Sequence, residues 1–269
     1  MVTIEREPAV AGRFYPGDAA SLDATVSELI GPDVTDERAI GIVAPHAGYV
    51  YSGAIAGEVY RRVHVPSLAI VMCPNHTGLG ARSAIMSEGV FRVPGHAIAI
   101  DEQAAEELRE LGLLTEDARA HVQEHALEVQ LPFLAHRNPS VQIVPLCLGT
   151  QSFESCVRIG SALADVVNHR GRDALIVAST DMSHYIPADD ASRLDRLAID
   201  RVEALDAEGL YSTVVDNDIS MCGFIPTTVM LVAARALGAR EARLVRYGNS
   251  GDVSGDYERV VGYAGFVIR

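Results

Sequence analysis

The sequence predicts a single α/β domain in which buried strands alternate with helices. Short runs rich in β-branched residues end at proline, glycine or polar clusters, and stretches with helical spacing separate these runs. Of the 269 residues, 48% are hydrophobic, which is enough for a sizeable core. No repeat and no long linker divides the chain, so one domain over residues 1–269 is expected.

Six segments are predicted to be strands because they are short and apolar. Pro45 follows the first of these segments and Pro74 follows the second, since proline has no amide proton to continue a ladder. The predicted strands are residues 39–44, 68–73, 141–148, 174–179, 241–247 and 260–268.

Helices are predicted where apolar residues recur at helical spacing. In the segment 52–63, Ile55 and Val59 fall on one face, while Arg61 and Arg62 fall on another. The last predicted helix is apolar on most sides, which implies that it is buried. The predicted helices are residues 52–63, 102–111, 124–136, 153–167, 190–205 and 227–237.

The net charge and the cysteine pattern exclude several classes of protein. With 36 acidic and 22 basic residues, the chain carries a formal charge of −14, which repels phosphate backbones and anionic lipids. We therefore expect no nucleic-acid partner and no membrane association. The chain starts without a leader-like apolar segment, and its four cysteines form no CxxC pair, so a cytoplasmic location is expected.

The motifs of several large enzyme classes are missing. The sequence contains no GxxxxGK[ST] and no strand-linked GxGxxG, so a nucleotide site on a glycine-rich loop is not supported. It contains no GxSxG elbow, and Ser179 and Ser183 lie near an acid and a base without the spacing of a catalytic triad.

Polar side chains follow three of the predicted strands directly. His46 follows the first strand, His76 the second, and Asp181 with His184 the strand at 174–179. Ligands bind outside the carboxyl ends of strands in open α/β sheets, so these residues can meet although they are distant in sequence. Because neutral imidazole is the commonest metal ligand, we predict a metal site at this edge. For any one of these histidines alone, a surface or capping role is the alternative.

Cys222 lies just before the predicted helix at 227–237. A helix dipole stabilises a thiolate at this position, which suits a metal ligand or a nucleophile. The alternative is a small buried packing residue, which is the role expected for Cys147 and Cys156. A mixed set of histidine and cysteine favours iron, copper or zinc over magnesium or calcium.

One motif points to a different chemistry. His121, Glu124 and His125 form an HxxEH pattern, in which inverted zinc peptidases hold zinc with two histidines on one helical face. The glutamate then acts as general base, and a further ligand has to come from a downstream helix, where Glu203 is the candidate. A pattern this short also arises by chance, so a helix-surface position for His121 is the alternative.

Ordered motifs cover the chain from about residue 7 to its end. They are AVAGRFYP at 9–16, APHAGY at 44–49, YSG at 51–53, PNH at 74–76, EHALEVQLPF at 124–133, STDMSHY at 179–185, CG at 222–223 and YGNSGD at 247–252. Together they resemble the MEMO family, found in bacteria and archaea as the B component of the AmmeMemoRadiSam system.

The resemblance implies a fold and a site. The implied fold is that of the class III extradiol ring-cleaving dioxygenases, an α/β/α sandwich around a largely parallel sheet. The implied metal ligands match His46, His76 and Cys222. The residues that match the rest of the pocket, and are candidates for catalysis, are His184, Asp181 and His125. AMMECR1-type and radical-SAM proteins of the same system are the implied partners.

Cys222 departs from the dioxygenases, which bind iron(II) with two histidines and a carboxylate. Metal binding is therefore expected ahead of ring cleavage, with iron(II) as the first candidate and copper or zinc as alternatives. The second hypothesis is an active non-haem iron dioxygenase of a small aromatic substrate, with His184 as general acid and base. The HxxEH zinc peptidase is the third.

Overall fold

The structure is a computed structural model that describes residues 4–171 and 173–269. A sheet of nine strands lies at the centre of this part of the chain. Its four middle strands are parallel and its outer strands are mainly antiparallel. In spatial order the strands are β10 (His184–Ile186), β12 (Val260–Ile268), β2 (Gly41–Ala44), β9 (Ala174–Ser179), β3 (Leu68–Cys73), β8 (Gln142–Leu148), β4 (Ser83–Ile85) and β7 (Thr115–Glu116), while β11 (Ala242–Asn249) pairs with β12.

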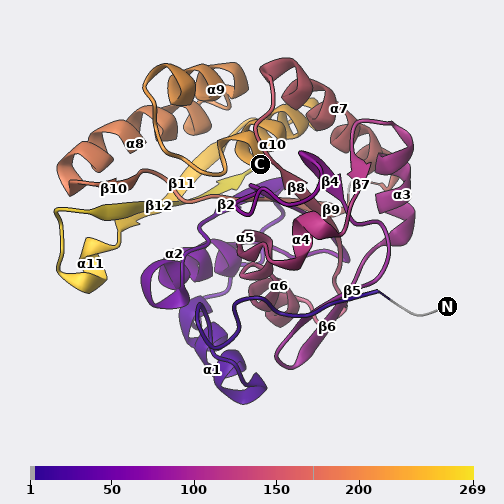
Figure 1. The fold of residues 1–269 in the computed structure, drawn as a ribbon, viewed down its shortest axis with the longest axis horizontal. Coiled ribbons are helices and arrows are strands. Elements are labelled where there is room, and N and C mark those ends of the chain that lie inside the picture. Colours follow the sequence, from indigo (N-terminus) through magenta and orange to yellow (C-terminus); the bar gives the residue numbers. More distant parts are fainter. Residues whose placement is uncertain (1–3, 172) are drawn as a thin grey trace.

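Helices lie on both sides of this sheet, above and below it in Figure 1. One layer contains α7 (Phe153–His169), α8 (Ala188–Glu203), α9 (Ala207–Asp216) and α10 (Phe224–Ala236). The other contains α1 (Ala19–Ile30), α2 (Tyr49–Arg62), α5 (His125–Glu128) and α6 (Leu131–Arg137). The remaining elements are α3 (Glu102–Glu110), α4 (Arg119–Val122), α11 (Gly251–Ser254) and a small sheet of β1 (Glu5–Arg6), β5 (Val90–Val93) and β6 (His96–Ala99).

The predicted α/β class is confirmed, with a mostly parallel sheet flanked by helices. Every residue of β2, β3 and β9 is buried, which explains their continuous apolar sequences, because parallel strands are covered on both faces. The buried character predicted for α10 is also confirmed. Among the residues that the structure describes, no helix is long and apolar enough to cross a membrane.

Most predicted elements match to within a few residues, but the helix predicted at 124–136 is wrong. The chain instead forms α5 and then α6, because Pro132 has no amide proton and occupies the first turn of a new helix. The helices α1 and α9 lie outside the predicted elements, although Asp18 and Asp206 accept hydrogen bonds at their N-termini as capping residues do.

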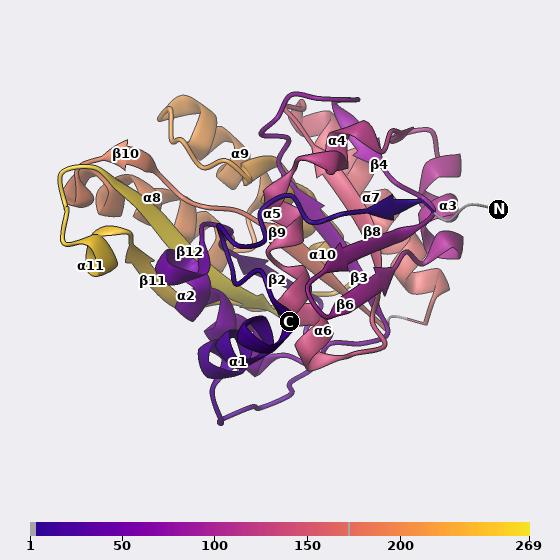
Figure 2. The same ribbon diagram turned by 60° about the horizontal axis from the view of Figure 1, so that its bottom comes forward.

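A buried ion pair ties the N-terminal segment to α5. The side chains of Arg6 and Glu128 are in contact, and both are almost inaccessible to solvent. The Glu128 carboxylate also accepts hydrogen bonds from the amides of Ala9 and Val10, at 2.7 and 3.1 Å, and from the Tyr15 hydroxyl. In Figure 2 the indigo N-terminal segment runs past α5. The pair therefore holds this segment against the helix that carries His125.

We expect Glu128→Ala to destabilise the protein by about 3–5 kcal/mol, because it leaves the Arg6 guanidinium buried without its charge partner. Urea unfolding followed by circular dichroism measures this change. Glu106→Ala is the control, since Glu106 makes a similar pair with Arg109 on the exposed face of α3. Equal unfolding midpoints for the two variants would contradict a structural role for the buried pair.

Candidate metal centre

Three neighbouring strands bring the predicted site residues to one edge of the sheet. His46 follows β2, Asp181 follows β9 and His76 follows β3, and these strands lie side by side in that order. The three residues line a cavity of about 540 Å³ together with the other predicted site residues, His125, His184 and Cys222. The carboxyl-edge position predicted from the strand ends is therefore the observed one.

Three imidazoles converge in this cavity. Ring nitrogens of His46, His76 and His125 lie within 4.8 Å of one another, a group that could hold a metal ion. The ring centres are 5.1 Å apart for His46 and His76, and 4.7 Å apart for His76 and His125. The group comes from three separate segments, two strand ends and the start of α5.

The Glu124 carboxylate orients His76. It accepts hydrogen bonds from the main-chain amide of His76 at 2.7 Å and from Nδ1 of the same residue at 2.9 Å. It also accepts from the Ala126 amide, and so caps α5. A carboxylate only accepts, so Nδ1 of His76 carries a proton, which leaves Nε2 as the nitrogen available to a metal ion. One buried carboxylate thus sets both the ring of His76 and the start of the helix that carries His125.

His46 is held by its own main chain and by β9. Its amide donates to Oδ1 of Asp181 at 2.8 Å, and its Nδ1 lies 3.0 Å from Oγ of Ser179. Burial, and then the neighbouring His76 and His125, hold the pKa of His46 well below its ordinary value. Burial also raises the pKa of Asp181 to about 7. His46 is therefore neutral at pH 7, as metal ligation requires.

Cys222 contacts the same imidazole. Its Sγ lies 3.2 Å from Nε2 of His46, and the Asp181 amide donates to it at 3.3 Å. A Cβ atom at position 223 would lie 2.3 Å from the carbonyl oxygen of Ser179. Glycine at this position therefore lets the main chain next to Cys222 pass close to the end of β9. The expected stabilisation of the thiolate by the helix dipole is wrong for the metal-free protein, because removal from water, and then the charge of Asp181, raises the pKa of Cys222.

His184 also lines the cavity, together with Asp181 and Cys222. Its Nδ1 lies 2.9 Å from the main-chain oxygen of Ser220, which only accepts, so Nε2 of His184 keeps a lone pair. Burial lowers its pKa. The next residue, Tyr185, also lines the cavity and has a φ of 61°, a strained value for a tyrosine. The backbone is thus held in an unusual conformation beside the site.

Six lining residues were not predicted as parts of the site. They are Phe14, Ala47, Gly48, Tyr185, Ser220 and Val261. The Phe14 ring lies edge-on to His125 at 4.9 Å, and its carbonyl oxygen accepts from the Tyr49 amide at 2.7 Å. The only signal for Phe14 in the sequence is its place in the motif at 9–16, because a phenylalanine in a loop carries no chemistry that points to a site.

Comparison with known proteins identifies the family. A family model described as Memo-like protein matches residues 6–267. A MEMO1 family protein of Methanopyrus kandleri is 41% identical to this chain, and the match covers 99% of each of the two chains. One of Aquifex aeolicus is 40% identical, and that match covers 98% of each chain. A third, from Methanothermobacter thermautotrophicus, is 39% identical over 96% of this chain and 98% of its own. The chain belongs to the Memo-like family.

A solved structure supports the fold of this Memo-like chain. The crystal structure of an uncharacterized protein from Escherichia coli K12 has a TM-score of 0.54 at 14% identity, and the match covers 84% of this chain and 99% of that one. At this identity the likeness shows the arrangement of helices and strands alone.

The HxxEH geometry predicted for a zinc peptidase is wrong in this Memo-like fold. His121 and His125 lie on different helices, α4 and α5, so they do not share a helical face. The His121 ring is buried 6.0 Å from the Phe91 ring, and within the described residues neither of its nitrogens has a hydrogen-bond partner. Glu124 is bound to His76, and the proposed further ligand, Glu203, pairs with Arg196.

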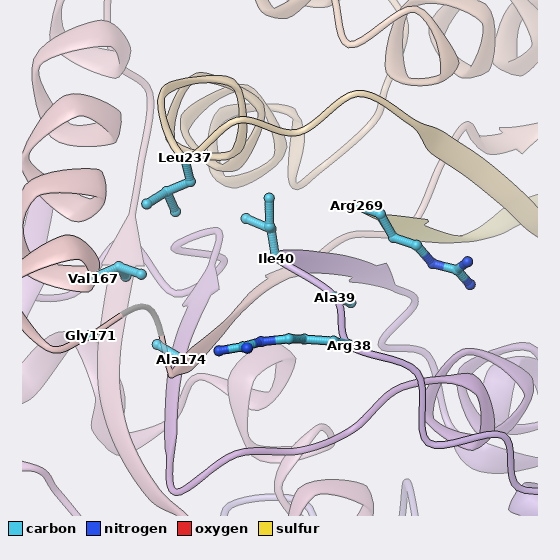
Figure 3. Close-up of a pocket in the computed structure, with 8 residues that line it drawn as sticks. All are labelled: Arg38, Ala39, Ile40, Val167, Gly171, Ala174, Leu237 and Arg269. Carbon is cyan, nitrogen blue, oxygen red and sulfur yellow. The ribbon is translucent and has the colours of Figure 1, made fainter.

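A second cavity of about 410 Å³ lies at the opposite edge of the sheet, near the amino ends of β2 and β9 (Figure 3). Its walls are mostly apolar, and its charged lining residues are Arg38 and Arg269. The described lining contains no histidine, cysteine or carboxylate side chain, so this cavity lacks the usual side-chain ligands of a metal ion.

We expect His121 to make stability depend on pH. Burial, and then the charge of Arg6, lower its pKa to about 4 in the folded protein, below the ordinary histidine value of 6.5. The unfolded chain therefore binds the proton more readily, so stability falls as the pH falls from about 6.5 to about 4. Between pH 7 and pH 5, the free energy of unfolding of wild type should fall by about 2 kcal/mol more than that of His121→Leu.

Urea unfolding at the two pH values measures this difference. His169→Leu is the control, because His169 is exposed at the end of α7 and this variant should keep the pH dependence of wild type. The expectation fails if His121→Leu and wild type lose the same stability between pH 7 and pH 5.

Proposed function

We propose that this protein binds one transition-metal ion at the carboxyl edge of its sheet. The convergence of His46, His76 and His125 beside the Cys222 thiol carries this proposal. Burial lowers the pKa of both His46 and His125, and neutral imidazoles bind a cation without first losing a proton. Their position in a cavity leaves room for the ion to enter.

The spacing of the donors fits one ion after a small contraction. Metal–nitrogen bonds of roughly 2.1 Å allow two ligands of one ion to lie at most about 4.2 Å apart. The histidine nitrogens lie up to 4.8 Å apart. Small side-chain rotations that move each nitrogen by a few tenths of an ångström therefore bring them close enough to bind one ion. The fixed Nδ1–H of His76 directs its Nε2 lone pair to the ion.

The donor set favours iron, copper or zinc, of which we propose iron or copper. Imidazole with thiolate suits iron, copper and zinc, whereas magnesium and calcium prefer oxygen. We assign His46 and His76 as ligands, with Cys222 as the third and His125 beside them. A bound ion of this kind supplies Lewis-acid or redox chemistry. Loss of the Cys222 proton is then coupled to metal binding, because burial keeps the free thiol protonated.

The first test is metal analysis of protein purified without a tag and without oxygen, followed by titration of the metal-free protein with cobalt(II). Wild type should bind one ion, and His76→Gln should bind at least about 10-fold more weakly because it loses one ligand. His169→Gln is the matched control, since this exposed histidine lies outside the cavity. Failure of wild type to bind iron, copper, zinc or cobalt would contradict the proposal.

The second test identifies the thiolate. Cobalt(II) bound through Cys222 should show thiolate-to-metal charge-transfer absorption in the near ultraviolet, and Cys222→Ala should abolish that absorption. Cys156→Ala is the control, because Cys156 is buried in α7 away from the cavity. Unchanged absorption in Cys222→Ala would exclude this ligand and leave His125 as the third.

A second candidate function, oxidation of a small aromatic substrate, rests on the groups beside the histidines. Asp181 and His184 line the cavity, and the free Nε2 of His184 can exchange a proton with a bound substrate. Cys222 replaces the carboxylate that a ring-cleaving iron site requires, which favours metal binding without efficient cleavage. Oxygen uptake by the iron(II)-loaded protein with a panel of catechols, at a kcat above about 1 s⁻¹, would reverse this ranking.

The cellular setting of this proposal comes from the family resemblance. We propose a cytoplasmic protein that works with AMMECR1-type and radical-SAM proteins in a redox or modification pathway. Association of the purified proteins, measured by analytical ultracentrifugation, tests these partners directly.

A further inference from the structure

A buried hydroxyl lies behind His46 and contacts three separate parts of the fold. Ser179, the last residue of β9, is fully buried. Its Oγ lies 3.0 Å from Nδ1 of His46, 2.9 Å from Nε2 of Gln130 and 2.6 Å from the main-chain oxygen of Ala126. Ser179 therefore joins the end of β2, the end of β9 and the α5–α6 segment.

The proton on this hydroxyl can be placed by counting donors and acceptors. A serine hydroxyl has one proton to donate and two lone pairs that accept. The carbonyl of Ala126 can only accept, so it takes the Ser179 proton. The amide nitrogen of Gln130 can only donate, so it occupies one lone pair. The remaining lone pair faces Nδ1 of His46, which must then carry a proton and donate it.

The orientation of Gln130, on which this count depends, is determined by its other contacts. Its Oε1 accepts from the Tyr60 hydroxyl at 3.0 Å, while its Nε2 also donates to the main-chain oxygen of Pro45 at 3.0 Å. Exchanging the two amide atoms would set Oε1 against the Pro45 oxygen with no proton between them. Only the orientation with Nε2 toward Ser179 satisfies these buried groups.

We propose that Ser179 is a positioning residue that holds His46 as the Nδ1–H tautomer, with the Nε2 lone pair directed to the metal cavity. This inference rests on the proposed metal centre and adds a residue that selects which nitrogen can bind the ion. The Cys222 thiol agrees with it, because Sγ lies 3.2 Å from Nε2 and can donate its proton there. A nucleophilic role for Ser179 is excluded, since its hydroxyl is buried and its proton is held by Ala126.

Loss of this hydroxyl should change the tautomer of His46. Without Ser179 Oγ, a proton on Nδ1 has no acceptor in a buried site, which is costly. A proton on Nε2 instead faces the sulfur of Cys222, which accepts hydrogen bonds only weakly. We therefore expect Ser179→Ala to populate both tautomers, and the Nε2–H form cannot bind a metal through that nitrogen.

Long-range ¹H–¹⁵N spectra of the metal-free protein test this directly, because they distinguish the two imidazole tautomers. Wild type should show His46 as Nδ1–H, and Ser179→Ala should show a mixture. Gln130→Met should keep the Nδ1–H form, since it removes a donor to Ser179 and leaves the lone pair that His46 uses. Thr228→Val is the control, because the Thr228 hydroxyl is buried and has no partner within the described residues.

Metal affinity gives the second measurement. The cobalt(II) dissociation constant should rise roughly 10- to 100-fold in Ser179→Ala and stay at the wild-type value in Thr228→Val. If Ser179→Ala fails to fold, Ser179→Cys fills the site with a slightly larger side chain that is a weaker acceptor, and it should show the same direction of change. A pure Nδ1–H form of His46 in the folded Ser179 variant overturns the inference.

The two proposals fail in different ways. Absence of metal binding in wild type removes the proposed function, while the tautomer of His46 in the metal-free protein still decides the role of Ser179. Metal binding in wild type, with an unchanged tautomer and an unchanged dissociation constant in Ser179→Ala, leaves the metal centre intact and rejects Ser179 as its positioning residue.

Discussion

The common carboxyl edge of β2, β9 and β3 is the constraint on which the rest of the site depends. Parallel strands paired side by side end in the same direction, so the residues that follow them are forced together. His46, Asp181 and His76 meet for this reason, although up to 135 residues separate them. The buried apolar strands that form the core thereby also hold the framework of the candidate metal centre.

Polar groups can be buried at this edge because each has a partner that satisfies it. Glu124 accepts three hydrogen bonds while it orients His76, and Ser179 pairs with both a carbonyl and His46. Glu128 accepts hydrogen bonds from main-chain amides of the N-terminal segment, and this segment carries Phe14, which lines the cavity. Such fixed partners hold the imidazoles in place before any ligand arrives, which reduces the entropy that binding has to overcome.

Burial has opposite consequences for the two kinds of donor in the site. It lowers the pKa of His46, which leaves the imidazole ready to bind a cation, and it raises the pKa of Cys222, which keeps the thiol protonated. If a metal ion binds as proposed, binding through Cys222 would therefore release a proton, whereas binding through His46 would not. The helix N-terminus beside Cys222 does not overcome the cost of placing a thiolate away from water.

The sequence by itself determined the α/β class, the strands β2, β3 and β9, and the placement of His46, His76 and Asp181 after them. It could do so because local signals of hydrophobicity and proline mark the ends of strands. Only the tertiary structure decided the surroundings of these residues. The split of 124–136 into α5 and α6, the burial of His121 and the contacts of Ser179 depend on segments far apart in the chain. Hydrogen-bond partners chosen by packing leave no periodic trace in the sequence, so no local pattern could have assigned them.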